Sequence, residues 1–499
     1  MGFEDATKGE IDQALQLSWQ AFQVYKEYPL TKRAELMATI AHELNKGAAN
    51  LIPVAAKETN LDAARLQSEL KRTIFQLESY AEACIDGTWL DARIDTADKS
   101  KSPVKPDLRK MLIPLGPVIV FGASNFPFAY STAGGDTACA LAAGCSVIVK
   151  AHPAHAETSD LVAAIIKKAL HALNMPEDIF IHIHGTSFEV GKELVEHPLT
   201  KAVGFTGSLE GGRALFDIGA RRPVPIPVFA EMGSVNPVFL LPGKLRQDAK
   251  AIASQLATSI TLSAGQFCTN PGILVGIDNE SLLKFRDYLE LEVEKVPPVK
   301  MLHPSIAKSF HEKRNAALQQ NDVKVIATAK YEENELQSLP TIATVKAKSF
   351  LNNPLLHKEV FGTYSLLVKC SDVDEMIEVA KALEGQLTAT IIGTSEEIRD
   401  RPQLINTLKE RAGRLVMNGV PTGVDVAIGM HHGGPYPATT DSRFTAVGAD
   451  GIRRFARPVC YQNWENELLP DALKNENPLH IWRTVNNQLT KNPVGRFPE

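Results

Sequence analysis

Four short apolar runs alternate with helix-like runs in the first half of the chain. The apolar runs are VIVFGAS, SVIVK, IFIHIHG and AVGFTGS, at residues 118–124, 146–150, 179–185 and 202–208. The segments between them, such as ETSDLVAAIIKKALHAL, have the composition of helices. Continuous apolar strands that alternate with helices predict βαβ units and a parallel sheet that is covered on both faces. Such a sheet binds ligands at the carboxyl ends of its strands.

A second alternation begins near Pro237 and runs to about Gly434. It contains the apolar runs VFLL and GILVGI, which are separated by the helix-like run DAKAIASQLATSITL. With 499 residues the chain is too long for one ordinary core, and two or three domains of roughly 100–250 residues are expected. The sequence therefore predicts an α/β protein with two α/β domains.

Composition and charge exclude several kinds of partner. A net charge of −5 and a pI near 6.3 give no reason to expect a nucleic acid or an anionic membrane as partner. Residues 111–135 carry no charged side chain, but Pro114, Pro117 and Pro127 argue against a membrane helix there. The six cysteines are scattered without metal-type spacing, so we expect a reduced, cytoplasmic protein.

One cysteine occupies an unusual position. Cys268 lies in SAGQFCTNPG, after a helix-like run and between Gly265 and the Pro271–Gly272 turn. The sequence therefore predicts a thiol on a tight, exposed corner. A structural cysteine is usually buried and behaves as a small hydrophobe, whereas a nucleophilic cysteine needs access and either a lowered pKa or a nearby base. The segment by itself leaves both interpretations open.

Polar residues follow several of the predicted strands. Gly207 and Ser208 open a helix-like run in GFTGSLEGGR, where backbone N–H groups could meet a pyrophosphate or form a plain turn. Lys150 ends the strand SVIVK, where it could reach a ribose or phosphate, or be solvated. Asn125 in GASNFPF could donate to an oxyanion or serve as a turn residue.

Two glutamates and two pairs of histidines are further candidates. Glu231 lies in VFAEMGSVNP after a strand-like run, where burial would favour a general base. Glu359 in HKEVFG is open to the same interpretation. The histidine pairs at residues 182/184 and 431/432 raise the question of a metal, but no third ligand or carboxylate is indicated beside them. We therefore predict no metal site.

Six motifs occur along the chain in the order GASNFP, VIVKAHPAH, VGFTGS, AEMGSVNP, GQFCTNPG and KEVFG. As an ordered set they resemble the NAD(P)-dependent aldehyde dehydrogenase superfamily, over nearly the whole chain. The resemblance implies a Rossmann-like parallel-sheet cofactor domain, a second α/β catalytic domain and a small oligomerisation element. The boundaries that we expect are 1–233 for the cofactor domain, with 92–113 in an oligomerisation hairpin, 234–434 for the catalytic domain, and 435–499 for a C-terminal oligomerisation segment. A homodimer or homotetramer is also implied.

The resemblance implies a role for each candidate catalytic residue. Cys268 would be the nucleophile that adds to the aldehyde carbon and then carries a thioester. The side-chain amide of Asn125 and the backbone N–H of Cys268 would stabilise the oxyanion. Glu231 would activate the water that hydrolyses the thioester. Since enzymes of the superfamily that pass the acyl group to coenzyme A typically lack this glutamate, hydrolysis is favoured over transfer to coenzyme A. A cofactor-free cysteine hydrolase is a further, weaker alternative.

The resemblance also implies a cofactor site. Lys150 would bond the adenosine ribose, and the Gly207–Ser208 turn would hold the pyrophosphate. Glu359 would hold the nicotinamide ribose, with Phe361 near the ring and Gly233 also in the cofactor site.

The choice between NAD and NADP depends on the residues after Lys150. NAD-preferring members often carry a glutamate three residues after this lysine, where it repels a 2′-phosphate. Here that position is Pro153, and His152 beside it could contribute to a phosphate site. Phe188 offers no cation. We therefore expect NAD or NADP, with a modest preference for NADP.

Two subgroups of the superfamily share the variants SNFPFAYSTAGGDTACALAAGC, MHHGGPYPAT and RRFARPVCYQNW. These are the α-ketoglutaric semialdehyde dehydrogenases and the NADP-linked fatty aldehyde dehydrogenases. His432 matches a histidine near the thiol of the latter, and we list it as a further candidate catalytic residue. The resemblance favours α-ketoglutaric semialdehyde as the small-molecule substrate, with a medium- or long-chain aldehyde as the alternative.

Each substrate would require a different pocket. A distal carboxylate calls for an arginine, and Arg443, Arg453 and Arg454 are the candidates nearest in sequence to the MHHGGPYP segment. A long-chain aldehyde calls for an apolar tunnel, which phenylalanines such as Phe126, Phe128 and Phe267 would line unless they belong to the core.

Overall fold

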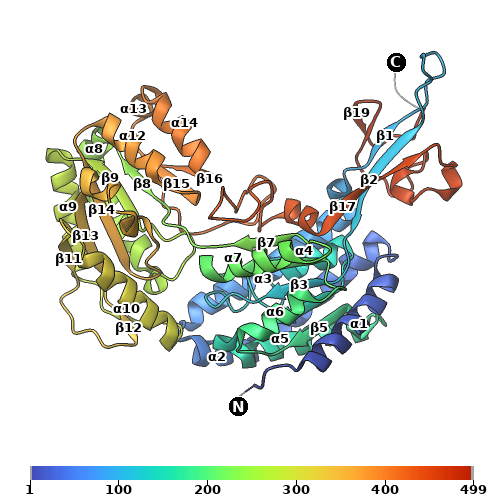
Figure 1. Ribbon diagram of the computed structural model, residues 1–499, viewed down its shortest axis with the longest axis horizontal. Helices are drawn as coiled ribbons and strands as arrows, with labels where there is room; N and C mark the ends of the chain where they lie inside the picture. Colours follow the sequence, from blue (N-terminus) through green and yellow to red (C-terminus); the bar gives the residue numbers. More distant parts are fainter. Residues whose placement is uncertain (1–2, 496–499) are drawn as a thin grey trace.

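The computed structural model describes residues 3–495, and three sheets organise the chain (Figure 1). Residues 1–2 and 496–499, at the ends of the first and third predicted segments, lie outside the described residues. A parallel sheet lies low in the view, a larger sheet lies to the left, and a third forms an arm that projects at the upper right. The predicted α/β architecture is confirmed, whereas the domain boundaries stay a prediction.

The first sheet is parallel and has the order β5-β4-β3-β6-β7. Its strands are β3 (Val118–Phe121), β4 (Val147–Lys150), β5 (Phe180–Ile183), β6 (Ala202–Thr206) and β7 (Val228–Glu231). Alternate residues of each strand point to opposite faces, so Val118 and Val120 pack on one side while Ile119 and Phe121 pack on the other. This accounts for the continuous apolar runs in the sequence.

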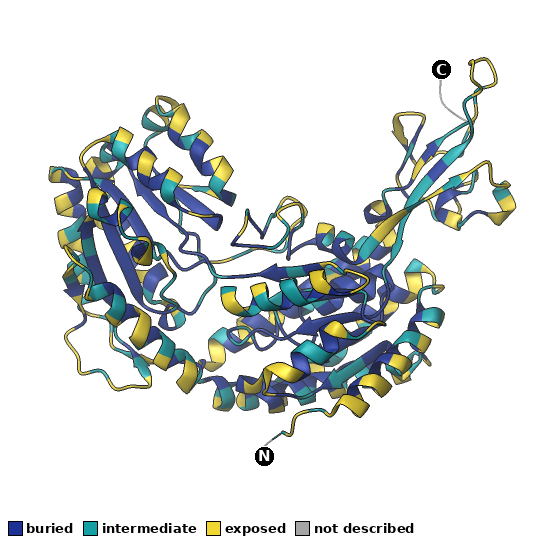
Figure 2. Cartoon of the chain, in the orientation of Figure 1, coloured by how far each residue is buried: buried dark blue, intermediate teal, exposed yellow. Residues whose placement is uncertain are grey.

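Helices cover both faces of this sheet, whose strands are mostly buried (Figure 2). One face packs against the helices α2 (Leu30–Thr59), α3 (Ala63–Asp86), α4 (Gly135–Ala143) and α5 (Ala156–Ala172). The other packs against α1 (Lys8–Tyr25), α6 (Phe188–Glu196) and α7 (Leu209–Arg221). Residues 111–135 form strand, turn and the start of α4, as the prolines in this segment predict.

The second sheet has seven strands in the order β11-β13-β14-β9-β8-β15-β16. Only β11 is antiparallel to its neighbour. The strands are β8 (Val238–Leu240), β9 (Ile273–Ile277), β11 (Lys324–Thr328), β13 (Thr341–Lys346), β14 (Tyr364–Cys370), β15 (Gln386–Ile392) and β16 (Ala412–Met417). One face packs on α8 (Pro242–Thr261) and α9 (Glu280–Val293), and the other on α10 (Pro304–Leu318), α11 (Ala347–Leu351), α12 (Val373–Ala382) and α14 (Pro402–Arg411). The short α13 (Ser395–Arg399) precedes α14, and β10 (Val299–Lys300) pairs with β12 (Gln337–Ser338).

The projecting arm is a sheet built from distant parts of the chain. Its order is β17-β2-β1-β18-β19, and all its neighbours are antiparallel except β1 and β18. The strands are β1 (Arg93–Asp95), β2 (Leu108–Pro114), β17 (Ala456–Gln462), β18 (Arg483–Val485) and β19 (Gln488–Thr490). The predicted hairpin segment, residues 92–113, contributes β1 and most of β2.

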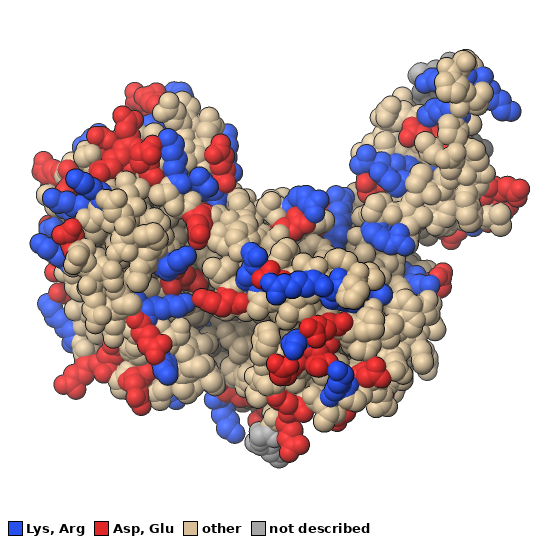
Figure 3. All heavy atoms as spheres, in the orientation of Figure 1, with Lys and Arg blue, Asp and Glu red and all other residues tan. Residues whose placement is uncertain are grey.

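Charged side chains of both signs are interspersed over the face of the molecule drawn in Figure 3. Such a mixed surface does not offer the large single-sign field that attracts nucleic acid. Within residues 3–495, none of the helices is both long and apolar enough to cross a membrane.

A buried ion pair links the segment before β17 to helix α4, which covers the first sheet. The Arg454 guanidinium lies 2.7 Å from the Asp136 carboxylate in the first turn of α4. The two side chains are 4% and 13% exposed. If one of them is removed, water therefore cannot solvate the charge that remains. Removing one charge from such a pair leaves the other uncompensated.

We expect Asp136→Asn to destabilise the protein by about 3–5 kcal/mol and to lower its thermal unfolding midpoint. The matched control is Asp471→Asn, which breaks the exposed Asp471–Lys474 pair and should cost about 1 kcal/mol or less. Differential scanning calorimetry of both variants measures the midpoints. Equal shifts in the two variants would show that the buried ion pair stabilises the protein no more than the exposed one does.

Candidate active site

The loop that carries Cys268 follows α8 through an unusual backbone turn. Ser263, Ala264 and Gly265 have φ angles of 49°, 58° and 65°, in the left-handed region that glycine tolerates best. A Cβ atom on Gly265 would collide with the backbone of Gly362. The turn thus requires glycine where two loops touch, and it directs the chain toward Cys268.

Buried amide side chains hold this loop in place. Asn236 Nδ2 donates to the carbonyl oxygens of Cys268 and Asn270, at 2.8 and 3.0 Å. Gln386 Oε1 in turn accepts from the backbone N–H groups of Asn236 and Val235, at 3.1 and 2.8 Å. Asn236 and Gln386 were not predicted from the sequence. The only available signal was a polar residue before Pro237, in a segment that otherwise reads as apolar strand.

Cys268 lies where two cavities meet. It lines one cavity of about 210 Å³ together with Gly207, Glu231 and Glu359. It also lines a second cavity of about 530 Å³, whose other walls include Arg72 and Phe267. The residue is half-buried, so the predicted exposed corner is wrong, because α3 and the loop at residues 423–425 cover it on the side of the second cavity.

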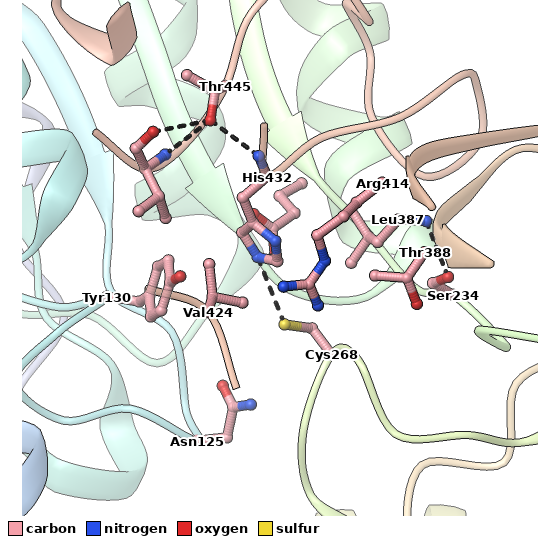
Figure 4. A network of polar contacts seen from close by, with 12 residues as sticks. Asn125, Tyr130, Ser234, Cys268, Leu387, Thr388, Arg414, Val424, His432 and Thr445 are labelled. Carbon is pink, nitrogen blue, oxygen red and sulfur yellow. Dashed lines mark hydrogen bonds and ion pairs between the residues drawn. The ribbon is translucent and has the colours of Figure 1, made fainter. Parts of the chain in front are cut away.

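Glu231 and His432 surround the thiol, and the view in Figure 4 shows His432 pointing at the Cys268 sulfur. His432 Nε2 lies 3.7 Å from Cys268 Sγ and 3.0 Å from Glu231 Oε1. Glu231 ends β7 and is 4% exposed, and its second oxygen, Oε2, is buried with no hydrogen-bond partner in the described part of the chain. The backbone N–H of His432 donates to Thr445 Oγ1 at 2.9 Å, which orients the residue.

The electrostatic environment of the thiol resists its ionisation. Burial raises the pKa of Cys268 well above its usual value, and the neighbouring Glu231 carboxylate raises it further. The Arg72 guanidinium acts in the opposite direction and lowers it. A thiolate at this position therefore depends on proton transfer to a neighbour or on added positive charge.

Two N–H groups are available beside the sulfur. Asn125 is 8% exposed, and its Nδ2 donates to the carbonyl oxygen of Gln266 at 3.1 Å, which leaves its second N–H for another acceptor. Within the described chain, the backbone N–H of Cys268 donates to no protein acceptor. Both donors thus have hydrogen-bonding capacity for an oxygen bound at the thiol.

The smaller cavity brings together most of the predicted cofactor residues. Its walls include Gly207, Ser208, Gly233, Glu359 and Phe361. Burial raises the pKa of Glu359 to about 7, and the Ser234 N–H is its one hydrogen-bond donor within residues 3–495. The carboxylate therefore retains acceptor capacity, and the residues present fit a ribose hydroxyl pair beside a nicotinamide ring.

The other predicted cofactor residues lie at the carboxyl end of β4. Lys150 is half-buried there, and burial lowers its pKa. His152 accepts a hydrogen bond from the Ala154 N–H at 3.1 Å, and Pro153 starts the short helix that follows. Burial, together with the nearby His155, holds the pKa of His152 well below its usual value. His152 is therefore neutral at physiological pH and offers no positive charge to a phosphate.

The larger cavity combines aromatic and charged walls. Phe126, Tyr130 and Phe267 line it together with Arg65 and Arg72 from α3. Arg65 and Arg72 are seven residues apart and so lie on one face of the helix. Phe128 lies in the turn after β3 and belongs to the hydrophobic core beside the first sheet instead.

The three arginines predicted from sequence proximity do not reach this site. Arg443 is paired with Asp441 at 2.6 Å on the surface, and Arg453 lies 3.6 Å from Asp450. Arg454 is buried against Asp136. The expectation is wrong because each guanidinium is paired with an aspartate and lines neither cavity at the thiol.

A carboxylate accompanies the histidine pair at residues 182 and 184, contrary to expectation. Asp160 Oδ1 lies 3.2 Å from His182 Nδ1 and 2.7 Å from His184 Nε2. The sequence did not indicate this contact because Asp160 comes from α5, which packs beside β5. Glu231, Cys268 and His432 form a second such group. The absence of a metal stays a prediction.

A thiol that lies between two cavities and contacts a histidine, beside two α/β sheets, is the arrangement expected of a cysteine-centred enzyme of the dinucleotide-binding α/β class. Comparison with known proteins gives the family. The sequence model of the aldehyde dehydrogenase family matches residues 1–447. The chain belongs to this family, whose members are oxidoreductases that use NAD or NADP.

The curated relatives include two of nearly full length. The α-ketoglutaric semialdehyde dehydrogenase of Acinetobacter baylyi is 45% identical over 98% of this chain and 93% of its own length. The α-ketoglutaric semialdehyde dehydrogenase 2 of Azospirillum brasilense is 45% identical over 96% of this chain and 92% of its own length.

Solved structures share the fold at lower identity. The NADP complex of glyceraldehyde-3-phosphate dehydrogenase GapN from Methanocaldococcus jannaschii is 18% identical, with a TM-score of 0.79, over 92% of this chain and 95% of that one. The 1-pyrroline-5-carboxylate dehydrogenase from Thermus with bound NAD is 22% identical, with a TM-score of 0.77, over 92% of this chain and 86% of that one.

Proposed function

We propose that the protein oxidises α-ketoglutaric semialdehyde to α-ketoglutarate with NAD(P)+ and water, through a thioester on Cys268. The observation that carries the chemistry is the contact of Cys268 with His432 and of His432 with Glu231, at the junction of two cavities. The two relatives with 45% identity support the substrate. The charged walls of the larger cavity favour a polar aldehyde over a fatty one.

The site residues divide the reaction between them. His432 takes the thiol proton, and its contact with Glu231 stabilises the resulting imidazolium. The thiolate of Cys268 adds to the aldehyde carbon, and the oxyanion accepts hydrogen bonds from Asn125 Nδ2 and the Cys268 N–H. Glu359 and Phe361 would hold a nicotinamide cofactor, whose chemistry when bound is hydride acceptance, and Cys268 would then carry the thioester. The unpartnered Oε2 of Glu231 then removes a proton from the water that hydrolyses it.

We expect Cys268→Ala to abolish aldehyde-dependent reduction of either cofactor, because no nucleophile remains. Glu231→Gln should release about one equivalent of reduced cofactor in a burst and then turn over some 10²–10⁴-fold more slowly, because water activation is lost. Rapid-mixing absorbance measurements of the reduced nicotinamide separate the two phases. Cys460→Ser, which changes an exposed cysteine, is the control. Full activity in Cys268→Ala would contradict the mechanism, and strict dependence on added coenzyme A would replace hydrolysis by acyl transfer.

The titration of Glu359 predicts a pH dependence for cofactor binding. Its pKa of about 7 means that the carboxylate, the form that accepts from ribose hydroxyls, forms as the pH rises through neutrality. The affinity for NAD+ should increase by about tenfold between about pH 6 and about pH 8. Isothermal titration calorimetry measures this, and Glu359→Gln should bind weakly at both pH values. An equally steep pH dependence in Glu359→Gln would assign the titration to another group.

The balance between NAD and NADP depends on a carboxylate that the sequence did not bring to attention. Asp5 Oδ1 and Oδ2 accept from the backbone N–H of Ser187, the N-cap of α6, and Oδ1 also accepts from that of Thr186. Asp5 is also close enough to Lys150 to raise the pKa of that lysine. Pro153 removes the usual repulsion of a 2′-phosphate, which supports the modest NADP preference. Asp5 opposes it, because it places negative charge near Lys150 and occupies donors at the start of α6.

We expect Asp5→Ala to raise the ratio of kcat/KM for NADP+ over NAD+ by about tenfold, since a charge that repels the phosphate is removed. Steady-state kinetics with both cofactors measures the ratio. Glu4→Ala removes the adjacent exposed carboxylate and should leave the ratio unchanged. The same shift in both variants would indicate a general charge effect, and no shift in Asp5→Ala would exclude its role in cofactor choice.

We also propose that the projecting arm joins copies of the chain into a homodimer or homotetramer. Val104, Trp464 and Leu489 on this arm are more than half exposed, which a monomer in water does not favour.

A further inference from the structure

Two arginines from distant elements lie near the thiol, and one of them, Arg72, lines the larger cavity. Arg72 comes from α3 and Arg414 from β16. Figure 4 shows the Arg414 guanidinium next to Cys268 and His432. Arg72 and Arg414 both lie within electrostatic range of the Cys268 thiolate and of Tyr130, because each of these groups raises the pKa of both arginines. Neither guanidinium takes part in the catalytic steps proposed for Cys268, His432 and Glu231.

Neither guanidinium has a carboxylate partner within 4.0 Å among the described residues. Three other shielded arginines have one: Arg65 lies 3.7 Å from Glu69, Arg314 lies 2.8 Å from Glu333, and Arg454 lies 2.7 Å from Asp136. Buried Arg33 and Arg222 donate to backbone carbonyl oxygens instead. A cation withdrawn from water is costly unless it is paired. Two guanidinium groups without a carboxylate partner beside one thiol and its cavity therefore suit an anion that binds there.

The hydrogen bonds of Arg72 orient it without satisfying it. Its Nε donates to the carbonyl oxygen of Val424 at 3.3 Å, and Nη2 donates to the Tyr130 hydroxyl at 3.2 Å. Its Nη1 is buried and has no hydrogen-bond partner among residues 3–495. The guanidinium also packs over the Tyr130 ring, 5.1 Å from its centre, so it is held in one orientation with an unused donor edge.

Arg414 is oriented by the same loop from the opposite side. Its Nη1 donates to the carbonyl oxygen of Gly423 at 3.0 Å, and Nη2 donates to that of Pro421. Each Nη atom carries a second N–H. The Asp425 carboxylate acts electrostatically to raise the pKa of Arg414. Asp425 is exposed, however, and forms no ion pair with Arg414 among the described residues. The positive charge of Arg414 thus remains available to a ligand at the thiol.

We propose that Arg72 and Arg414 bind the carboxylate of the substrate at the end remote from the aldehyde. This inference rests on the proposed function, and it names the residues that select an anionic semialdehyde. Guanidinium groups suit this task because their planar donor edges match a carboxylate. Their position beside Cys268 suits a short chain, in which the carboxylate and the aldehyde carbon are only a few bonds apart. Phe126 and Phe267 then contact the intervening methylene groups.

A purely structural role is the competing explanation, since both arginines hold the loop at residues 421–424. Kinetic constants for two aldehydes of equal length distinguish the two roles. α-Ketoglutaric semialdehyde carries the carboxylate, whereas pentanal does not. Loss of the loop's position would affect both aldehydes, while loss of a carboxylate contact affects only the anionic one.

We expect Arg72→Gln and Arg414→Gln each to lower kcat/KM for the semialdehyde by about 10- to 100-fold more than kcat/KM for pentanal, mainly through KM. Loss of positive charge beside the thiol affects both aldehydes, whereas loss of the carboxylate contact affects only the anionic one. Arg72→Lys should recover part of the loss, because it keeps the charge but not the planar edge. Arg443→Gln, which alters an exposed arginine already paired with Asp441, should change neither substrate. Thermal unfolding of each variant verifies that it is folded.

Glutarate, a dicarboxylate without an aldehyde, supplies a second readout that does not depend on oxidation of the semialdehyde. It should inhibit the wild-type enzyme competitively against pentanal, and Arg72→Gln should weaken that inhibition by a similar factor. Equal losses for both aldehydes, with glutarate inhibition retained, would overturn the carboxylate role while leaving the proposed function intact. A wild-type enzyme that oxidised pentanal as well as the semialdehyde would instead overturn the proposed substrate.

Discussion

The fixed position of the Cys268 loop is the constraint on which the rest of the site depends. The loop crosses between the two α/β sheets, so its carbonyl groups are withdrawn from water and require internal donors. Asn236 supplies them, and Gln386 holds Asn236 in turn. The left-handed turn through Gly265 completes the arrangement. With the backbone immobilised in this way, the thiol faces both cavities at once, and two ligands approach one sulfur from different sides.

Charge at the thiol follows from this burial. A sulfur withdrawn from water holds its proton, and Glu231 reinforces that effect. The site also contains groups that favour loss of the thiol proton. His432 contacts both the thiol and Glu231, and the positive charges of Arg72 and Arg414 favour the thiolate. An anionic substrate bound at those arginines would neutralise part of that field. Under the proposal made for Arg72 and Arg414, substrate recognition and thiol reactivity would be coupled through the same two guanidinium groups.

Local patterns in the sequence were sufficient to predict the strands of the sheets and the residues at the strand ends. The runs at 118–124 and 202–208 became β3 and β6, and Glu231 ends β7 as its position predicted. Periodicity and strand order place such residues because all parallel strands end at one edge. Arg443, Arg453 and Arg454 were misplaced, since nearness in sequence to His432 does not determine the direction of a side chain, and each is paired with an aspartate. Asp5 and Asp160 were missed for a related reason, because their partners come from other elements.

The sequence by itself thus determined the α/β architecture, the family and a thiol with an amide and a carboxylate at strand ends, because these follow from local periodicity and from ordered motifs. Only the tertiary structure decided which charges meet in space. Arg72 and Arg414 come from a helix and a strand that lie far apart in the chain, and each is unremarkable in its own segment. Their lack of carboxylate partners becomes visible only when the packing removes them from water, since an unpaired arginine in an exposed helix costs nothing.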